Sequence, residues 1–130
     1  MRVLICGGPK VGKTTLSYEL KGSPTLHTDD LLDLAWSEQS RQIVRWLEKP
    51  GPWVIEGHSV VRGLRKWLRV HAEGLPFDYL IYLTKAKYER TNGQEALDKS
   101  VRTIWNEIND EIVKRCVALG PLAPRIEYRK

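Results

Sequence analysis

Long apolar runs and cysteines are scarce in this 130-residue sequence. No stretch approaches the roughly 20 apolar residues that cross a bilayer, so we expect no membrane-spanning segment. The apolar run from Val3 to Cys6 is far shorter than that of a secretory signal, which favours a cytoplasmic protein, in the host cytoplasm if a phage encodes it. Cys6 lies in this run and Cys116 lies in a late helical pattern. We expect both to be small buried side chains rather than a disulfide or a metal pair.

Internal repeats, flexible linkers and low-complexity tracts are also missing. Together with the length, this predicts one domain over residues 1–130, which is large enough for a proper core. The net charge of +5 favours an anionic partner, although a nucleotide, a nucleic acid and simple solubility all account for it. The charge is unevenly distributed, because residues 60–72 are basic and contain no acid, whereas residues 28–38 are acidic.

Short apolar runs alternate with helical patterns along the chain. Continuous apolar runs bounded by glycine, proline or polar residues predict buried parallel strands at residues 3–6, 25–27, 53–57, 77–83 and, as an edge strand, 125–129. Apolar residues that recur three or four apart predict helices at residues 13–21, 29–47, 60–71 and 94–119. We therefore predict an α/β three-layer sandwich, with a parallel sheet of about five strands, helices on both faces and a site at the carboxyl ends of the strands.

Residues 7–14 match the phosphate-binding pattern G-x-x-x-x-G-K-[ST] at every fixed position. The motif lies between a predicted strand and a predicted helix, where backbone N–H groups and the helix N-terminus face an anion. Lys13 would reach the terminal phosphates, and Thr14 would supply an oxygen to Mg²⁺. The motif therefore predicts a P-loop NTPase fold that binds ATP and Mg²⁺. The residues expected to hold the nucleotide are Gly7, Gly8, Pro9, Lys10, Val11, Gly12, Lys13, Thr14 and Thr15.

Three kinds of protein use such a loop: switch GTPases, motor or remodelling ATPases, and kinases. The guanine-specifying N-K-x-D and the D-x-x-G switch are absent, and the chain is short for a motor or a remodeller, which leaves a kinase. In "HTDDLL", Asp29 and Asp30 follow the second predicted strand, where a carboxylate can accept a proton from an attacking hydroxyl. Alternatively, one of them only caps a helix. The sequence leaves open which of the two is the base.

A carboxylate and a histidine follow the third predicted strand. Glu56 ends the apolar run "WVIE", a position that lies near Mg²⁺ or its waters in a phosphate-loop fold. The alternative is a strand-end acid that pairs with a nearby base. His58 is a candidate for contact with the substrate, although a lone histidine is more often a surface residue or a hydrogen-bonded one.

These features resemble the small P-loop kinases that include polynucleotide kinase, shikimate kinase and chloramphenicol phosphotransferase. The resemblance rests on the G-x-x-x-x-G-K-T loop, the aspartate pair after the second strand and the apolar strand that ends on a carboxylate. It implies that Asp29, with Asp30 as the alternative, is the catalytic base. The segments "HTDD", "GPWVIEG", "LRKWL" and "TNGQEAL" are also similar to small phage-encoded P-loop kinases. That group is linked to the phosphorylation of hydroxymethylated bases in phage DNA, such as 5-hydroxymethyluracil.

The resemblance also implies a basic lid near residues 84–94, with an arginine that stabilises charge on the transferring phosphoryl group. Lys85, Lys87 and Arg90 lie in this segment, and Arg90 is the expected catalytic arginine. The segment is short for a lid of this kind. Arg62 and Arg125 are therefore alternatives for the catalytic arginine.

One face of the predicted helix at residues 60–71 is basic and carries Arg62, Arg65, Lys66 and Arg69. Beside an ATP site, such a face suits a nucleic-acid backbone, and the interleaved Trp67 could support an unstacked base. The alternative is a solvated face with Trp67 in the core, where we also expect Trp36. The candidate substrate-binding residues are Asp30, His58, Arg62, Arg65 and Lys66.

The sequence thus favours an ATP- and Mg²⁺-dependent kinase that phosphorylates a hydroxyl, with DNA as the expected partner and a hydroxymethylated pyrimidine as the acceptor. A base inside a duplex would have to be extruded or presented single-stranded. A small-metabolite or nucleotide kinase is the first alternative. The second is a nucleotide-binding module or slow ATPase without an acceptor.

Overall fold

The computed structural model describes residues 1–20 and 22–130, in which strands and helices alternate. The strands are β1 (Arg2–Gly7), β2 (Thr25–His27), β3 (Trp53–Glu56), β4 (Tyr79–Leu83) and β5 (Arg125–Arg129). The α-helices are α1 (Lys13–Glu19), α2 (Trp36–Leu47), α3 (Val60–Val70) and α4 (Asn92–Leu119). Short 3₁₀ turns lie at Thr28–Leu31 and Gly120–Leu122.

The strands of the described chain form one five-stranded sheet in the order β2-β3-β1-β4-β5, and every neighbouring pair is parallel. The central strand β1 is apolar throughout its middle, and Leu4, Ile5 and Cys6 are fully buried. Such a continuous apolar run is what a parallel strand needs when both of its faces are covered. The predicted α/β fold is confirmed, with β5 as the edge strand.

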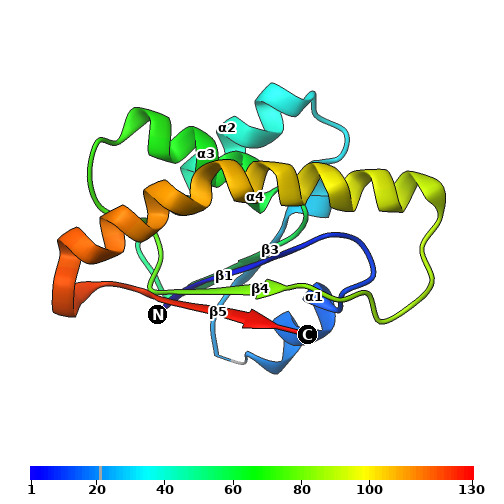
Figure 1. Ribbon diagram of the computed structural model, residues 1–130, viewed down its shortest axis with the longest axis horizontal. Helices are drawn as coiled ribbons and strands as arrows, with labels where there is room; N and C mark the ends of the chain where they lie inside the picture. Colours follow the sequence, from blue (N-terminus) through cyan, green and yellow to red (C-terminus); the bar gives the residue numbers. More distant parts are fainter. Residues whose placement is uncertain (21) are drawn as a thin grey trace.

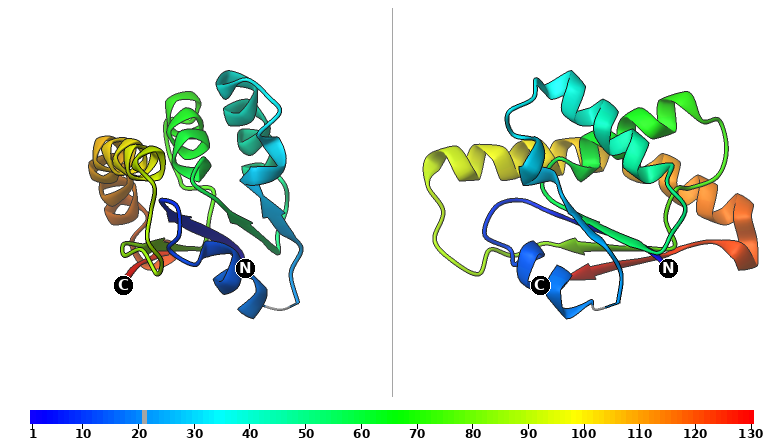
Figure 2. Two further views of the ribbon diagram at one scale, coloured as in Figure 1. Left: turned by 90° about the vertical axis from the view of Figure 1, so that its right-hand side faces the viewer. Right: turned by 180° about the vertical axis from the view of Figure 1, so that it is seen from behind.

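Helices cover the two faces of the sheet unequally. Figure 1 shows α2, α3 and α4 above the sheet and α1 below it, and the left view of Figure 2 shows the three upper helices in a row. The upper core is the larger one and takes side chains from each of these helices, such as Ile43, Leu64 and Ile108. In the lower core, Leu16 of α1 packs beneath Ile5 and its neighbours on the sheet. The three predicted layers are therefore present.

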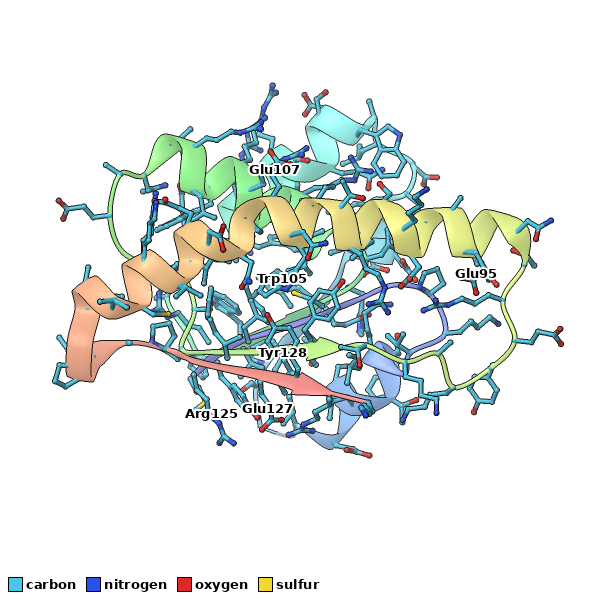
Figure 3. All side chains as sticks on the ribbon, in the orientation of Figure 1. Glu95, Trp105, Glu107, Arg125, Glu127 and Tyr128 are labelled. Atoms are coloured by element: carbon cyan, nitrogen blue, oxygen red, sulfur yellow. The ribbon has the colours of Figure 1, made fainter. Side chains whose placement is uncertain are left out.

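An aromatic cluster holds α4 over the edge of the sheet. Trp105 of α4 donates its Nε1 hydrogen to the hydroxyl of Tyr128 on β5 over 3.1 Å. The ring of Tyr82 on β4 lies 5.2 Å from that of Trp105. Figure 3 shows Trp105 and Tyr128 between α4 and β5, and Arg125 and Glu127 on the opposite side of the strand. This alternation places charged side chains on the outer face of an edge strand, which discourages pairing with other chains.

The segment 29–47 differs from the single helix that its pattern predicts. Thr28–Leu31 forms a 3₁₀ turn, and α2 begins only at Trp36. Among residues 29–38 only Leu31 is buried, whereas Leu32 is 57% and Trp36 is 53% exposed. No apolar face therefore spans the start of the predicted helix, and a helix there would have little to pack against. The prediction that Trp36 lies in the core is wrong.

The prediction that both cysteine side chains are buried is confirmed for Cys6 and holds only in part for Cys116. Both thiols are free, and Cys6 is buried while Cys116 is partly buried against the upper core. Burial raises the pKa of the Cys6 thiol to about 12, which makes it a poor nucleophile. Within residues 1–20 and 22–130, none of the helices combines the length and the apolar character needed to span a membrane.

The direction of the strand order reverses at β1, which is the central strand of the sheet. From β1 the chain proceeds to β2 and β3 on one side, and then to β4 and β5 on the other. In open parallel sheets, ligands bind outside the carboxyl ends of the strands at such a point. At this edge Glu56 of β3 is in register with Ile5 of β1 and with His27 of β2. The start of α4 lies at the same end of the molecule (Figure 1).

Candidate active site

The turn between β1 and α1 contains two residues, Lys10 and Gly12, in the left-handed region of backbone conformation. Gly12 has φ of 92°, in the left-handed region that favours glycine. Lys10 has φ of 64°, which is uncommon for a residue with a side chain, and such conformations gather at functional sites. Lys13 folds back over this turn, because its Nζ donates to the Gly8 carbonyl over 2.5 Å. The turn and its lysine therefore form one compact unit.

The surroundings of Lys13 shift the pKa of its ammonium group. Burial lowers the pKa of Lys13, while the carboxylates of Glu56 and Asp29 act in the opposite direction. Both acids are therefore close enough to interact electrostatically with the ammonium group. A partly desolvated ammonium group above a turn of backbone amides is suited to bind phosphate oxygens.

Two hollows flank this turn, and Gly12, Thr15 and Tyr88 belong to both. The first has a volume of about 470 Å³ and lies between α1 and the end of β4. The second has a volume of about 440 Å³. Its lining brings together residues that the sequence predicted from three separate motifs, namely Lys13, Thr14, Asp29, Glu56 and His58.

The predicted nucleotide-binding residues fall into two groups. Those that line the second hollow are Pro9, Lys10, Gly12, Lys13, Thr14 and Thr15. Gly7, Gly8 and Val11 are instead buried, and the Val11 side chain packs in the lower core beside Ile5. Val11 therefore anchors the turn to the sheet, and it also contributes to the lining of the first hollow.

Of the two predicted aspartates, Asp29 lines the second hollow and Asp30 does not, as far as the described residues go. Both aspartates are exposed to solvent. The Asp29 Oδ1 atom lies 3.7 Å from Nδ1 of His58. Burial lowers the pKa of His58, and Asp29 opposes this shift, so the imidazole is largely neutral near pH 7. Asp29 is thus an accessible carboxylate that lies beside a neutral imidazole.

Glu56 ends β3 beneath the turn between β1 and α1 and is 2% exposed. Its Oε1 accepts from the Thr14 hydroxyl over 3.3 Å and lies 2.6 Å from Nδ1 of His27. A hydroxyl and a carboxylate are oxygen donors of the kind that Mg²⁺ takes from proteins, with phosphates and waters as its other ligands. Within the described residues, no cluster of three or more His, Cys, Asp and Glu could hold a metal ion alone. The donor set therefore fits Mg²⁺ that is shared with a bound phosphate.

The segment 84–91, which joins β4 to α4, is hydrogen-bonded to the turn between β1 and α1. The backbone N–H of Lys87 donates to the Lys10 carbonyl over 2.6 Å, and Nε of Arg90 donates to the Pro9 carbonyl over 2.7 Å. The Arg90 side chain is 5% exposed and lies 3.2 Å from Asp98. Arg90 is therefore beside the turn, as the sequence predicts, but its contacts are those of a residue that positions the turn.

Asp98 on α4 is the centre of this connection. It forms ion pairs with Arg90 at 3.2 Å and with Arg102 at 2.8 Å, and Arg102 also donates to the Thr84 carbonyl. A Cβ atom at Gly8 would lie only 2.1 Å from Oδ1 of Asp98, so a side chain there would displace the carboxylate. The turn between β1 and α1, the segment 84–91 and α4 therefore meet at one buried carboxylate.

The two alternatives to Arg90 lie in different places. Arg125 is in register with Tyr79, at the amino end of β4, which puts it at the edge of the sheet away from the turn. Arg62 lies in the first turn of α3, and its charge contributes to the lowered pKa of His58. Of the two, Arg62 is the one near the second hollow.

The basic face of α3 lines a third hollow, of about 220 Å³, against the start of α2. We call it the basic groove and define it by Arg62, Arg65, Lys66, Arg69 and Trp36. Glu107 of α4 pairs with Arg65 at 3.0 Å and with Arg69 at 3.3 Å, and Figure 3 shows it between α4 and α3. Trp67 is 7% exposed and belongs to the upper core, as one of the two sequence interpretations holds.

His27 and Asp98 are contacts of the site that the sequence analysis missed. His27 had a detectable signal, because it ends a strand that precedes the aspartate pair and such strand ends meet at the same edge. Asp98 and Arg102 have the i, i+4 spacing of a helical ion pair. The contact of Asp98 with Gly8 joins distant parts of the chain, so no local pattern shows it.

No protein-family model matches the chain, and no curated protein matches its sequence. What the site does must therefore be inferred from its residues and their geometry.

Proposed function

We propose that the chain is an ATP- and Mg²⁺-dependent kinase that transfers the γ-phosphate to a hydroxyl group. The observation that carries this proposal is the second hollow, where Lys13 and Thr14 share one lining with Glu56 and the accessible Asp29. Phosphoryl transfer to a hydroxyl needs a cation on the phosphates, oxygen ligands for Mg²⁺ and a carboxylate that accepts the proton. Each of these parts has a residue in this hollow.

In the proposed reaction, Asp29 accepts the proton of the acceptor hydroxyl, whose oxygen bonds to the γ-phosphorus as the bond to the bridging oxygen breaks and ADP leaves. Lys13 neutralises charge on the phosphates. Thr14 and Glu56 would hold Mg²⁺ directly or through its waters, and the ion supplies further positive charge to the phosphates. Arg90, fixed by Asp98 and the Pro9 carbonyl, holds the turn in shape.

The first hollow suits the nucleobase of ATP. It adjoins the phosphate-binding turn at Gly12 and Thr15, and Leu16, Leu83 and Tyr88 give it apolar and aromatic surface. Such surfaces with a few polar groups are typical of sites for small molecules. With the base there, the second hollow is left for the γ-phosphate and the acceptor.

The acceptor that we favour is a hydroxymethylated pyrimidine in DNA, such as 5-hydroxymethyluracil. The basic groove begins at Arg62, close to His58, and continues along α3 through Arg65 and Lys66. A row of cations next to the transfer site suits a phosphate backbone. The resemblance to phage-encoded kinases favours the same acceptor, and the reaction would take place in the cytoplasm of the host cell.

Replacing Lys13 with alanine should weaken ATP binding by roughly 10- to 150-fold. This loss of affinity corresponds to the usual free energy of a hydrogen bond to a charged group. The control is Lys114→Ala, because Lys114 is an exposed lysine on the far half of α4. Isothermal titration with ATP and Mg²⁺ measures both. Equal affinity of Lys13→Ala and the wild type would contradict the assignment of the phosphate site.

The direct test is transfer of γ-labelled phosphate from ATP, with Mg²⁺, to a panel of acceptors. The panel contains unmodified DNA, DNA with 5-hydroxymethyluracil, RNA with a free 5′-hydroxyl, and nucleoside monophosphates. We expect label on the modified DNA alone. Label only on the small acceptors would indicate a small-metabolite or nucleotide kinase. ATP binding without label on any acceptor would indicate a nucleotide-binding module or slow ATPase.

A further inference from the structure

Trp36 differs from the other four tryptophans of the chain in its exposure. It is 53% exposed, whereas Trp46, Trp53, Trp67 and Trp105 are 7% exposed or less. A tryptophan in water forgoes the stabilisation that its large apolar surface would gain on burial. Its ring is nevertheless held in place, because the Arg62 guanidinium carbon lies 4.4 Å from the ring centroid. The molecule therefore presents a positioned aromatic ring to the solvent.

Arg62 connects this ring to the rest of the fold. Its Nη2 donates to the Ser100 hydroxyl on α4 over 3.0 Å, so the guanidinium is fixed at one end and stacked at the other. Burial, and then the neighbouring charge of Arg65, lower the pKa of Arg62. The cations of the basic groove are thus close enough to repel one another, and an anion between them would relieve that repulsion.

The charges of the basic groove follow a line that leads away from the transfer site. Arg62 and Arg69 are seven residues apart on α3, a separation of about 10 Å at the helical rise. About three steps of a DNA strand cover the same length. Within the described chain, the groove's own lining holds no acid, and the nearby Glu107 takes up part of the charge of Arg65 and Arg69.

We propose that the basic groove is a docking surface for a DNA strand with one unstacked base, in which the cations bind the phosphates and the base stacks on Trp36 and Arg62. A base inside a duplex has its faces covered by its neighbours, so only an extruded or single-stranded base can use an exposed ring. This inference rests on the proposed function. The base that stacks on Trp36 would be a neighbour of the acceptor base, and it would help to place that acceptor at Asp29.

The first experiment measures binding without ATP. A short oligothymidylate is titrated into the protein at low salt while tryptophan fluorescence is recorded. All five tryptophans emit, but Trp36 is the exposed one that a bound base can reach, so the part of the quenching that is lost in Trp36→Ala belongs to it. We expect quenching, and a loss of affinity of about 5- to 150-fold in Trp36→Ala, the range found for base–aromatic stacking. Trp36→Phe keeps an aromatic face, so it should retain most of the affinity, measured by fluorescence polarisation of a labelled oligonucleotide.

The second experiment changes the charge of the groove in both directions. Lys66→Ala should weaken binding and reduce the salt slope by about 1. Glu107→Gln should strengthen binding and steepen the slope, because it frees Arg65 and Arg69 from their shared partner. The matched control is Lys49→Ala, an exposed lysine just beyond the far end of α2. A purely structural role for these residues predicts no gain of affinity in Glu107→Gln.

Several results would overturn the inference. These are unchanged affinity in Trp36→Ala, tighter binding of the duplex than of the single strand, equal binding of inorganic polyphosphate, and equal binding of RNA of the same sequence. The proposed function fails separately, because its loss would appear as intact oligothymidylate binding without phosphate transfer to any acceptor. Transfer to modified DNA with a groove that binds no single strand would refute the docking surface alone.

Discussion

Replacing Asp29 with asparagine should reduce phosphoryl transfer by roughly 10²- to 10⁴-fold, the usual contribution of a positioned general base. The substitution keeps the shape of the side chain and its place in the second hollow but removes the group that accepts the proton. ATP affinity should change little, because the proposed nucleotide site consists of the turn and Lys13, which the substitution leaves intact. Single-turnover transfer from labelled ATP and titration with ATP measure the two quantities separately.

The neighbouring aspartates sharpen this test. Asp30→Asn should lose far less activity than Asp29→Asn, because Asp30 lies outside the lining of the second hollow in the described chain. Asp33→Asn is the matched control, because Asp33 is an exposed aspartate of the same segment. A large loss in Asp30→Asn with an active Asp29→Asn would reverse the assignment of the base. Full activity in both variants would refute a carboxylate base in this segment.

Replacing Asp98 with alanine should lower the free energy of unfolding by about 3 to 5 kcal/mol, the usual cost of removing one partner of a buried ion pair. The substitution leaves the 5% exposed Arg90 guanidinium with only the more distant Glu95 carboxylate, at 3.8 Å, and removes the contact that backs Gly8. ATP affinity should fall as well, because the turn loses its support from α4. Urea denaturation of the protein without ligand measures the change in the free energy of unfolding.

An exposed ion pair provides the comparison for Asp98. Glu38 pairs with Arg41 on the surface of α2, with both side chains about half exposed. Glu38→Ala should cost less than about 1 kcal/mol, because exposed pairs contribute little. If Asp98→Ala were as mild as Glu38→Ala, the connection between α4 and the phosphate-binding turn would not be a significant source of stability.

Most of the fold and part of the candidate site could be predicted from local sequence patterns. The apolar run of β1, the glycine spacing of the turn and Lys13 are neighbours in sequence, so their pattern predicts both the strand and the phosphate site. Asp29 was predicted because it follows a strand and Glu56 because it ends an apolar strand run, and parallel strands end at the same edge. These positions depend on the topology of the sheet, which the alternation of strands and helices indicates.

Other features depend on packing between distant segments. Arg90 and Pro9 are 81 positions apart, and their hydrogen bond follows from how α4 lies against the turn. The predicted helix over residues 29–47 failed for a related reason. Leucine and tryptophan at helical spacing suggest a buried face, but Leu32 is 57% and Trp36 is 53% exposed. A pattern of apolar residues does not show whether a partner surface exists.

The single helix α1 beneath the sheet would link the proposed nucleotide binding to folding. In the described chain it is the only helix on that face, and its seven residues are too few for a helix that is stable alone. A nucleotide bound at its first residue, Lys13, would add about 2.7 kcal/mol to the native state at a concentration 100 times its dissociation constant. The lower layer and the ligand would then share one cooperative equilibrium. The cell's nucleotide level would in this way set how much of the protein survives heat or proteolysis.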